Sequence, residues 1–263
     1  LYSTYGDGFG FKPQVSEKLS LGLVRIDGGP SDFTGINLRS NSIEQRGQGR
    51  RGRKSWGILC VNGILYLWLG HADRNGGESQ LAWSKNHGEA WEYADWTLAD
   101  FGLMGFINYG KDYAGARDSF VYAYSHDGPR ADGPANRFIM MRVPRNEITR
   151  RESWEFFVRL DERSKPVWSA EITQRGSVFE HHDACLRSAM TYNAGLQRYL
   201  WWQAIPQPHE HKDRGDTRFD GGFGIYDAPE PWGPWTTTFF TRKWDVGPGE
   251  HGDFPTKWMS VDG

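Results

Sequence analysis

The chain has 263 residues with 31 Lys and Arg against 33 Asp and Glu, so its formal charge of −2 gives no general attraction to nucleic acid or acidic membranes. No apolar run approaches the ~20 residues needed to cross a bilayer, and two cysteines, Cys60 and Cys185, do not make a disulfide framework. Aromatic residues make up 15% of the chain and Gly contributes 33, which favours an all-β protein with aromatic packing and tight turns.

The predicted elements are short strands joined by turn signals. Asn62-Gly63 and Asn193-Ala194-Gly195 separate apolar and aromatic runs, and such residues tolerate the positive φ that hairpin turns need. In chain order the pattern predicts strands over residues 1–6, 19–26, 55–61, 64–69, 106–110, 119–124, 137–143, 188–192, 198–202 and 256–261.

Hairpins that recur at roughly 45–85 residues indicate repeated blades. We predict an all-β, five-bladed β-propeller in one domain, residues 1–263, because no linker interrupts the strands. Residues 1–6 read as the second strand of a hairpin, and residues 256–261 read as a first strand followed only by a turn. We therefore expect a fragment truncated at both ends; the alternative is that the last strand completes the first blade.

Residues 84–91 fit the pattern Ser-x-Asp-x-Gly-x-x-Trp, with Asn86 at the Asp position. The pattern resembles the Asp-box turn of sialidase-like propellers. That resemblance implies a structural role, in which the polar side chain caps the turn and Trp91 packs beneath it.

Propeller geometry predicts that one face collects the chemistry. The turns between first and second strands lie on one face, whereas second-to-third loops and blade connections lie on the other. This second face receives most of the charged and imidazole side chains, around the mouth of a central funnel. The candidate site residues are Asp7, Lys54, Trp56, Asp73, His181, Arg187, Glu250, Asp253 and Lys257.

Several of these candidates have a simpler interpretation. Asp7, between two glycines, could stabilise a tight turn. His181 and His182 are adjacent, and neighbouring strand residues point to opposite faces, so we predict no metal site and no required cofactor; a structural calcium remains possible. The basic residues between positions 46 and 54 favour a solvated loop or an anionic glycan contact over nucleic acid.

Several segments together resemble a bacterial propeller family first catalogued as a domain of unknown function, with members that are endo-D-arabinanases. The resemblance implies a carboxylate pair at the funnel, with Asp7 in the Gly-Asp-Gly turn and its partner on an innermost strand that would precede Leu1. It rests on six segments: Tyr5-Gly6-Asp7-Gly8, residues 79–84, Gly115-Ala116-Arg117-Asp118, Val178-Phe179-Glu180-His181, residues 224–236 and Phe254-Pro255-Thr256-Lys257-Trp258.

The favoured function is a carbohydrate-active hydrolase that cleaves a polysaccharide or oligosaccharide with paired carboxylates, one of them Asp7. Glu250 and Asp253 are further carboxylates on the same rim, and Trp56, His181, Arg187 and Lys257 would contact sugar. One alternative is a polysaccharide lyase, with His181 or Tyr192 as base and Arg187 neutralising a uronate. Another is a non-catalytic glycan-binding propeller. We expect a monomer, and a polysaccharide substrate favours export of the parent protein.

Overall fold

The computed structural model describes residues 1–47, 52–71, 77–99, 101–129, 133–206, 221–244, 251–260 and 262. In these residues the chain is all-β, with 18 strands and four single turns of 3-10 helix. The helical turns of these ranges are all far too short to span a membrane. The predicted all-β class is therefore confirmed for the described part of the chain.

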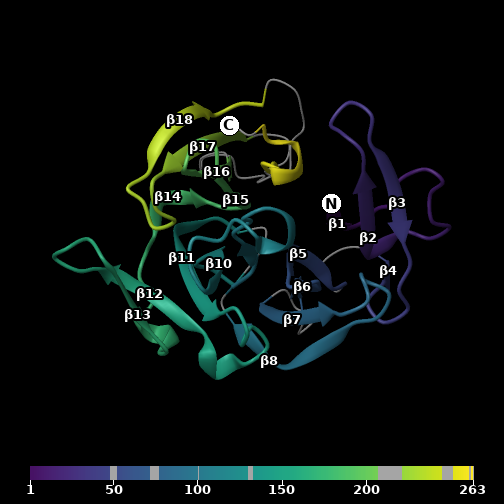
Figure 1. Ribbon diagram of the computed structural model, residues 1–263, viewed down its shortest axis with the longest axis horizontal. Helices are drawn as coiled ribbons and strands as arrows, with labels where there is room; N and C mark the ends of the chain where they lie inside the picture. Colours follow the sequence, from purple (N-terminus) through teal and green to yellow (C-terminus); the bar gives the residue numbers. More distant parts are fainter. Residues whose placement is uncertain are drawn as a thin grey trace.

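Four antiparallel sheets radiate from a common centre as the blades of a propeller, as Figure 1 shows. We number the blades in chain order. Blade 1 contains β1 (Tyr2–Tyr5), β2 (Leu19–Asp27), β3 (Thr34–Leu38) and β4 (Gln45–Arg46); blade 2 contains β5 (Lys54–Val61), β6 (Ile64–Gly70), β7 (Glu78–Ser84) and β8 (Glu92–Ala99); blade 3 contains β9 (Gly105–Phe106), β10 (Phe120–His126), β11 (Ala135–Pro144), β12 (Glu155–Leu160), β13 (Pro166–Ser169) and β14 (Phe179–Cys185); blade 4 contains β15 (Ser188–Asn193), β16 (Arg198–Ile205), β17 (Gly222–Ala228) and β18 (Thr236–Thr241).

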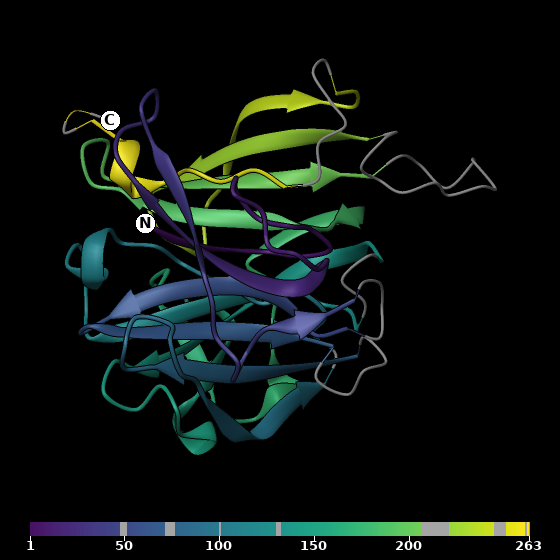
Figure 2. The same cartoon turned by 90° about the vertical axis from the view of Figure 1, so that its right-hand side faces the viewer.

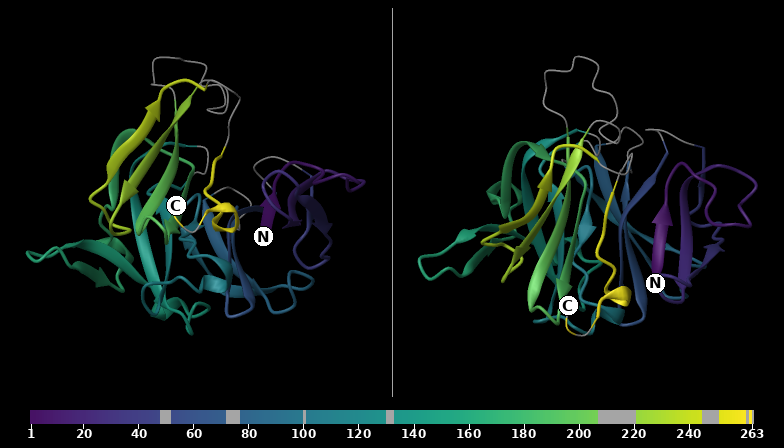
Figure 3. Two further views of the ribbon diagram at one scale, coloured as in Figure 1. Left: turned by 45° about the horizontal axis from the view of Figure 1, so that its top comes forward. Right: turned by 90° about the horizontal axis from the view of Figure 1, so that it is seen from above.

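One strand of each blade faces the centre. These are β1, β5, β9 and β15, and each contacts the next around the ring. The end of β1 meets the start of β5, since Asp7 pairs with Lys54, so β1 runs opposite to β5 and in the direction of the second strand β6. After β15 the ring continues with η4 (Thr256–Trp258), which contacts β15 and lies between blade 4 and blade 1 in Figure 3. The last described segment of the chain therefore joins the two ends of the ring.

The two hairpins predicted from turn signals are present. Val61 pairs with Ile64 across Asn62-Gly63, and both turn residues adopt positive φ, 52° and 76°. In blade 4, Asn193 pairs with Arg198, and its side-chain oxygen accepts a hydrogen bond from the Leu196 N–H at 3.0 Å. Asn62-Gly63 determines the first hairpin because Asn and Gly tolerate the left-handed backbone of a tight turn. In the second hairpin the left-handed residue is Gln197 (φ 52°), and Asn193 contributes through its side-chain hydrogen bond.

The turn between β7 and β8 is closed by its own side chains. Ser84 Oγ accepts a hydrogen bond from the Gly88 N–H, and Asn86 Oδ1 accepts one from the Ala90 N–H, both at 2.9 Å. The buried indole of Trp91 donates to the Gly88 carbonyl at 3.0 Å. Asn86 thus caps the turn and Trp91 packs under it, which is the structural role expected from the sequence.

Aromatic side chains fill the space between blades. Trp68 of blade 2 is fully buried, with its ring 5.8 Å from Phe106 and 5.7 Å from Trp154, which lies between β11 and β12 of blade 3. Trp201 of blade 4 packs against Phe138 of blade 3 at 4.7 Å. Burying rings of this size stabilises each blade against its neighbour by several kcal/mol, at ~25 cal/mol per Å² of apolar surface.

The number of blades differs from the prediction: the described residues form four blades rather than five. The strand predicted over residues 256–261 is wrong, because residues 256–258 form the 3-10 turn η4 with Trp258 N bonded to the Pro255 carbonyl at 3.0 Å. Pro255 has no N–H to give to a ladder and so disfavours a paired strand here.

Exposed large apolar side chains are concentrated on the two blades beside η4. Among the described residues, six of the seven such side chains lie on blade 1 or blade 4, which face each other across the last segment. The six are Leu1, Phe9, Phe33, Leu196, Phe239 and Phe240.

Candidate active site

One end of the propeller gathers the starts of inner strands and the ends of their neighbours. Lys54 begins β5 and pairs with Gly70 at the end of β6, while Ser188 begins β15 and pairs with Gln203 near the end of β16. Asp7 follows β1 at the same end because its side chain reaches Lys54. We call this end the mouth, defined by Asp7, Lys54, His71, Arg187 and Asp253.

Asp7 and Lys54 form an ion pair between blade 1 and blade 2. The Lys54 Nζ donates to Asp7 Oδ1, and the lysine side chain is only 11% exposed whereas the aspartate side chain is 41% exposed. A buried ammonium requires a counter-ion because its desolvation is costly. Asp7 therefore does more than stabilise its own left-handed turn (φ 50°): its charged carboxylate stands at the mouth with one side open to solvent.

Trp56 forms part of the wall of the mouth. Its indole meets the His71 ring edge-on at 5.6 Å and an interplanar angle of 77°. It also lies directly on Gly70, where an added Cβ would come within 1.5 Å of the indole nitrogen. Gly70 is thus the residue that allows Trp56 to lie against β6, half-buried and fixed in orientation.

His71 is a feature of the mouth that the sequence analysis did not assign to the site. It is buried, has a left-handed backbone (φ 56°), and its Nδ1 lies 3.1 Å from the Gly52 carbonyl. Its position directly after β6 matches that of Asp7 after β1. That correspondence between blades was visible in the sequence and could have identified His71.

Arg187 lies at the start of β15, half-buried at the edge of blade 4. Its carbonyl accepts a hydrogen bond from the Ala204 N–H at 2.8 Å, which fixes the backbone beside the end of β16. The structure therefore places the backbone of Arg187 at the same end of the propeller as Lys54 and Asp7.

Asp253 belongs to the segment that leads into η4. Its side chain is exposed, although protein atoms surround it densely and this desolvation raises the pKa of its carboxyl above the usual range. Both observations hold for a carboxyl on a concave wall. Solvent touches the carboxyl there, while protein atoms fill most of the volume around it. The Phe254 N–H, at 2.7 Å, and the Thr191 hydroxyl oppose the rise in pKa.

His181 lies on blade 3, beside the outer edge of blade 4. It is on β14, and its ring is 6.1 Å from that of Phe240 on β18, the outermost strand of that blade. Burial, with a smaller contribution from Arg242, lowers the pKa of His181, so the imidazole is neutral at pH 7. Its contacts join it to the blade edge rather than to Lys54.

Lys257 lies at the opposite end of the propeller from Asp7. Its Nζ donates to the Ile26 carbonyl at 2.9 Å, and Ile26 N in turn bonds the Leu1 carbonyl at the start of β1. Asp7 follows the other end of that strand, about 20 Å further along at 3.3 Å per residue. Figure 2 shows η4 beside the chain start at one end of the strands. The structure therefore separates Lys257 from the residues of the mouth.

Two further candidates, Asp73 and Glu250, lie outside the described residues. Within the described ranges no group of three or more His, Cys, Asp and Glu side chains could hold a metal ion. The pair His182 and Asp183 contact each other at 3.4 Å and have no such third partner there.

A second carboxylate near the mouth, Asp127, is enclosed by cations. It follows β10, its side chain is 9% exposed, and it bonds Arg137 at 2.6 Å and Arg175 at 2.9 Å. Two guanidinium groups hold both carboxylate oxygens. Asp127 therefore links blade 3 internally and has little remaining capacity to transfer protons.

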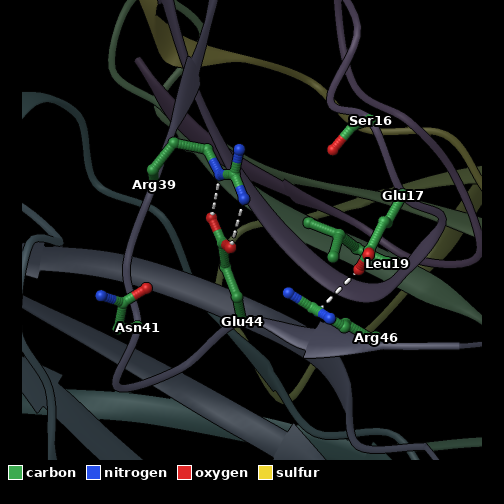
Figure 4. Close-up of a pocket in the computed structure, with 7 residues that line it drawn as sticks. All are labelled: Ser16, Glu17, Leu19, Arg39, Asn41, Glu44 and Arg46. Atoms are coloured by element: carbon green, nitrogen blue, oxygen red, sulfur yellow. Dashed lines mark hydrogen bonds and ion pairs between the residues drawn. The ribbon is translucent and has the colours of Figure 1, made fainter.

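A polar pocket of about 230 Å³ opens on blade 1 close to Asp7 (Figure 4). Its Leu19 exchanges two backbone hydrogen bonds with Gly8, the residue after Asp7. Two ion pairs lie in the lining, so their four charges cancel while hydrogen-bonding groups remain at the surface. The lining residues are Ser16, Glu17, Leu19, Arg39, Asn41, Glu44 and Arg46, with Arg39 paired to Glu44 at 2.7 Å and Arg46 to Glu17 at 2.6 Å.

Comparison with known proteins places this chain among propellers by structure alone. No protein-family model and no curated protein matches the sequence. An α-L-arabinofuranosidase (CtGH43) of Clostridium thermocellum matches with a TM-score of 0.51 at 10% identity, over 96% of this chain and 73% of that one. A proposed exo-β-1,3-galactanase of Bifidobacterium bifidum matches with a TM-score of 0.51 at 11% identity, over 92% and 68%.

A GH43_1 enzyme of Xanthomonas citri is also similar, with a TM-score of 0.45 at 15% identity over 90% of this chain and 69% of that one. At these identities the likeness shows the fold. The chain therefore shares the propeller architecture of the arabinofuranosidase and of the galactanase.

Proposed function

We propose that this chain is a glycoside hydrolase in which Asp7 supplies one of the two carboxylates that the reaction uses. The observation that carries the proposal is the ion pair at the mouth, where the buried Lys54 holds a charged carboxylate that remains 41% exposed. The similar structures support it, since two are named for cleaving arabinofuranosides and galactan.

Asp7 acts in this proposal as the base or nucleophile of the reaction. Lys54 holds one carboxylate oxygen by an ion pair, and the exposed part of the side chain faces a bound sugar. Trp56 offers the apolar body of its indole to a sugar face, and Arg187 donates to hydroxyl groups. His181 and Lys257 are weaker candidates for sugar contact, because one lies at the blade edge and the other at the opposite end.

The substrate in this proposal is a neutral sugar polymer. The polar pocket beside Asp7 contains two arginines, and each is already neutralised by a glutamate. Its lining offers donors and acceptors for hydroxyl groups without an excess charge to attract a uronate. It would bind a sugar unit next to the one held at Asp7.

The polysaccharide lyase is less well supported. Tyr192, one candidate base, lies near the far end of β15 from Arg187 and packs against Tyr109 and Tyr199. His181, the other, lies at the blade edge beside Phe240. A lyase needs base and cation around one uronate, and these residues do not converge.

The proposal includes D-arabinan among several substrate classes, because the sequence resembles endo-D-arabinanases. We further propose that a fifth sheet packs between blade 4 and blade 1, the two blades that carry most of the exposed large apolar side chains of the described residues, and that the protein is a single-domain monomer. Export of the parent protein and independence of any cofactor are part of the same proposal.

The test is a product screen with the chain of 263 residues. D-arabinan, L-arabinan, xylan and β-1,3-galactan are incubated with the protein, with Asp7→Asn and with the surface control Asp95→Asn. New reducing ends with the first and last protein, and none with Asp7→Asn, would support the hydrolase. Products that absorb as unsaturated uronates from a pectic substrate would indicate the lyase, and binding without products would indicate a glycan-binding module.

A further inference from the structure

Asp253 is the described carboxylate that best complements Asp7. The segment from residue 251 to 258 lies between blade 4 and blade 1, so Asp253 and Asp7 belong to neighbouring positions of the ring. Asp127, the other carboxylate near the mouth, is excluded because two arginines saturate it. Asp253 is exposed and so accessible to a ligand.

We propose that Asp253 is the proton donor of the hydrolysis, acting on the glycosidic oxygen of a sugar held at Asp7. The inference rests on the proposed function, because it assigns the second carboxylate of that same reaction. No motif in the sequence distinguishes Asp253 from the other acidic residues of the rim. Its position in the ring distinguishes it from them.

The step is a proton transfer coupled to bond cleavage. The Asp253 carboxyl gives its proton to the glycosidic oxygen, and the electron pair of the breaking carbon–oxygen bond stays with that oxygen, which leaves as an alcohol. Asp253 is left as a carboxylate. If water attacks the sugar carbon directly, Asp7 takes its proton and solvent returns a proton to Asp253. If Asp7 attacks, water then displaces Asp7 from the sugar carbon and gives its proton to Asp253.

The surroundings of Asp253 suit a group that must hold a proton near neutral pH. Desolvation raises the pKa of its carboxyl. Tyr124, on β10 of blade 3, lies close enough for the charge of Asp253 to contribute to raising the pKa of its phenol. From blade 4 it meets the Thr191 hydroxyl, and on its own segment the Phe254 N–H. No lysine or arginine of the described residues is among the groups that shift it.

Packing on both sides fixes the position of this segment. Gly252 lies on the Trp202 indole so closely that a Cβ would come within 2.6 Å of the ring, and the His251 ring meets the same indole at 5.6 Å. On the other side, Lys257 and Trp258 donate to carbonyls of Ile26 and Gly28, on or directly after β2. A proton donor needs this kind of fixed placement to lie within hydrogen-bond reach of the leaving oxygen.

The experiment compares leaving groups. The substrate is the sugar identified in the product screen, as its natural polymer and as 2,4-dinitrophenyl glycoside. A dinitrophenolate leaves without a proton, so Asp253→Asn should lose about 10²–10⁴-fold in kcat/KM on the polymer while keeping most of its activity on the aryl glycoside. The basic limb of the pH profile should also disappear. Asp95→Asn is the matched control on an exposed part of β8.

The outcomes separate this inference from the function on which it rests. A wild-type chain that cleaves no polymer overturns both. A wild-type chain that cleaves a polymer, with Asp253→Asn equally active or equally impaired on both substrates, overturns the role of Asp253 and leaves the hydrolase. Circular dichroism and thermal unfolding of each variant exclude loss of the fold as the cause.

Discussion

Asp7 and Asp127 are two carboxylates at the same end of the propeller, and both are paired with cations, yet their surroundings differ. Asp7 of blade 1 bonds the buried Lys54 of blade 2, and 41% of its side chain is exposed. Asp127 lies between Arg137 and Arg175, which belong to the same blade, and 9% of its side chain is exposed. A carboxylate that is fully coordinated contributes to the fold. One that keeps much of its surface exposed can still meet a ligand.

The largest effect should follow from changing Asp7. Asp7→Asn keeps the size of the side chain and a hydrogen-bond acceptor for Lys54 but removes its charge. If Asp7 is base or nucleophile, polymer cleavage should fall by at least about 100-fold while the thermal unfolding midpoint changes little. Activity assays and calorimetry on one sample check this. Unchanged turnover would mean that Asp7 is only a turn residue.

Asp127→Asn should show the reverse pattern. Arg137 and Arg175 would lose their shared counter-ion, and Arg175 is only 19% exposed. We expect a loss of ~2 kcal/mol in the free energy of unfolding, below the value for a fully buried pair because Arg137 is 39% exposed. Urea unfolding measures the loss. A larger fall in turnover per folded molecule than in stability would contradict the comparison.

Gly70→Ala tests the wall of the mouth. The new methyl group would overlap the Trp56 indole, so the tryptophan must move or the strands must separate. We expect a cost of ~1–3 kcal/mol in stability and a rise in KM, because Trp56 would lose its orientation. Ser79→Ala, one strand further out, removes a buried hydroxyl that donates to the Phe101 carbonyl at 2.6 Å, so it should cost stability without raising KM and serves as the control for sugar binding.

Lys54→Met examines the cation rather than the carboxylate. Met fills a similar volume and needs no counter-ion, and the exposed Asp7 can be solvated by water. Stability should therefore change by less than about 1 kcal/mol, whereas activity should fall because Asp7 loses its orienting partner. Equal activity of the variant and the wild type would remove Lys54 from the site.

The smallest effect concerns Asp253 and pH. Its pKa is raised in the folded chain, so the folded state binds this proton more tightly than the unfolded state, in which the pKa is about 3.9. The stability that the proton contributes is present below the unfolded-state pKa and is lost as pH rises through the folded-state pKa. Asp253→Asn stays neutral, so it should unfold at a higher temperature than the wild type near pH 7. That difference should vanish below the unfolded-state pKa.

Much of the fold could be predicted because it depends on neighbours in sequence. Asn62-Gly63 fixes a hairpin, Asn86 and Trp91 fix a capped turn, and alternating apolar residues fix the strands. The last segment was mispredicted, since its apolar pattern suggested a strand while Pro255 and its contacts with blade 1 produced a 3-10 turn. The candidate site was only partly predictable, since Lys257 was placed at the mouth by its position in the chain and lies at the other end.

By itself the sequence determined most of the strands and their turns, because these follow from backbone preferences over a few residues. The tertiary structure alone decided which charged groups meet. Lys54 is 47 residues from Asp7, and Arg175 is 48 from Asp127. Pairing of this kind depends on how whole blades pack around the axis, and no local pattern encodes which cation will be buried beside which carboxylate.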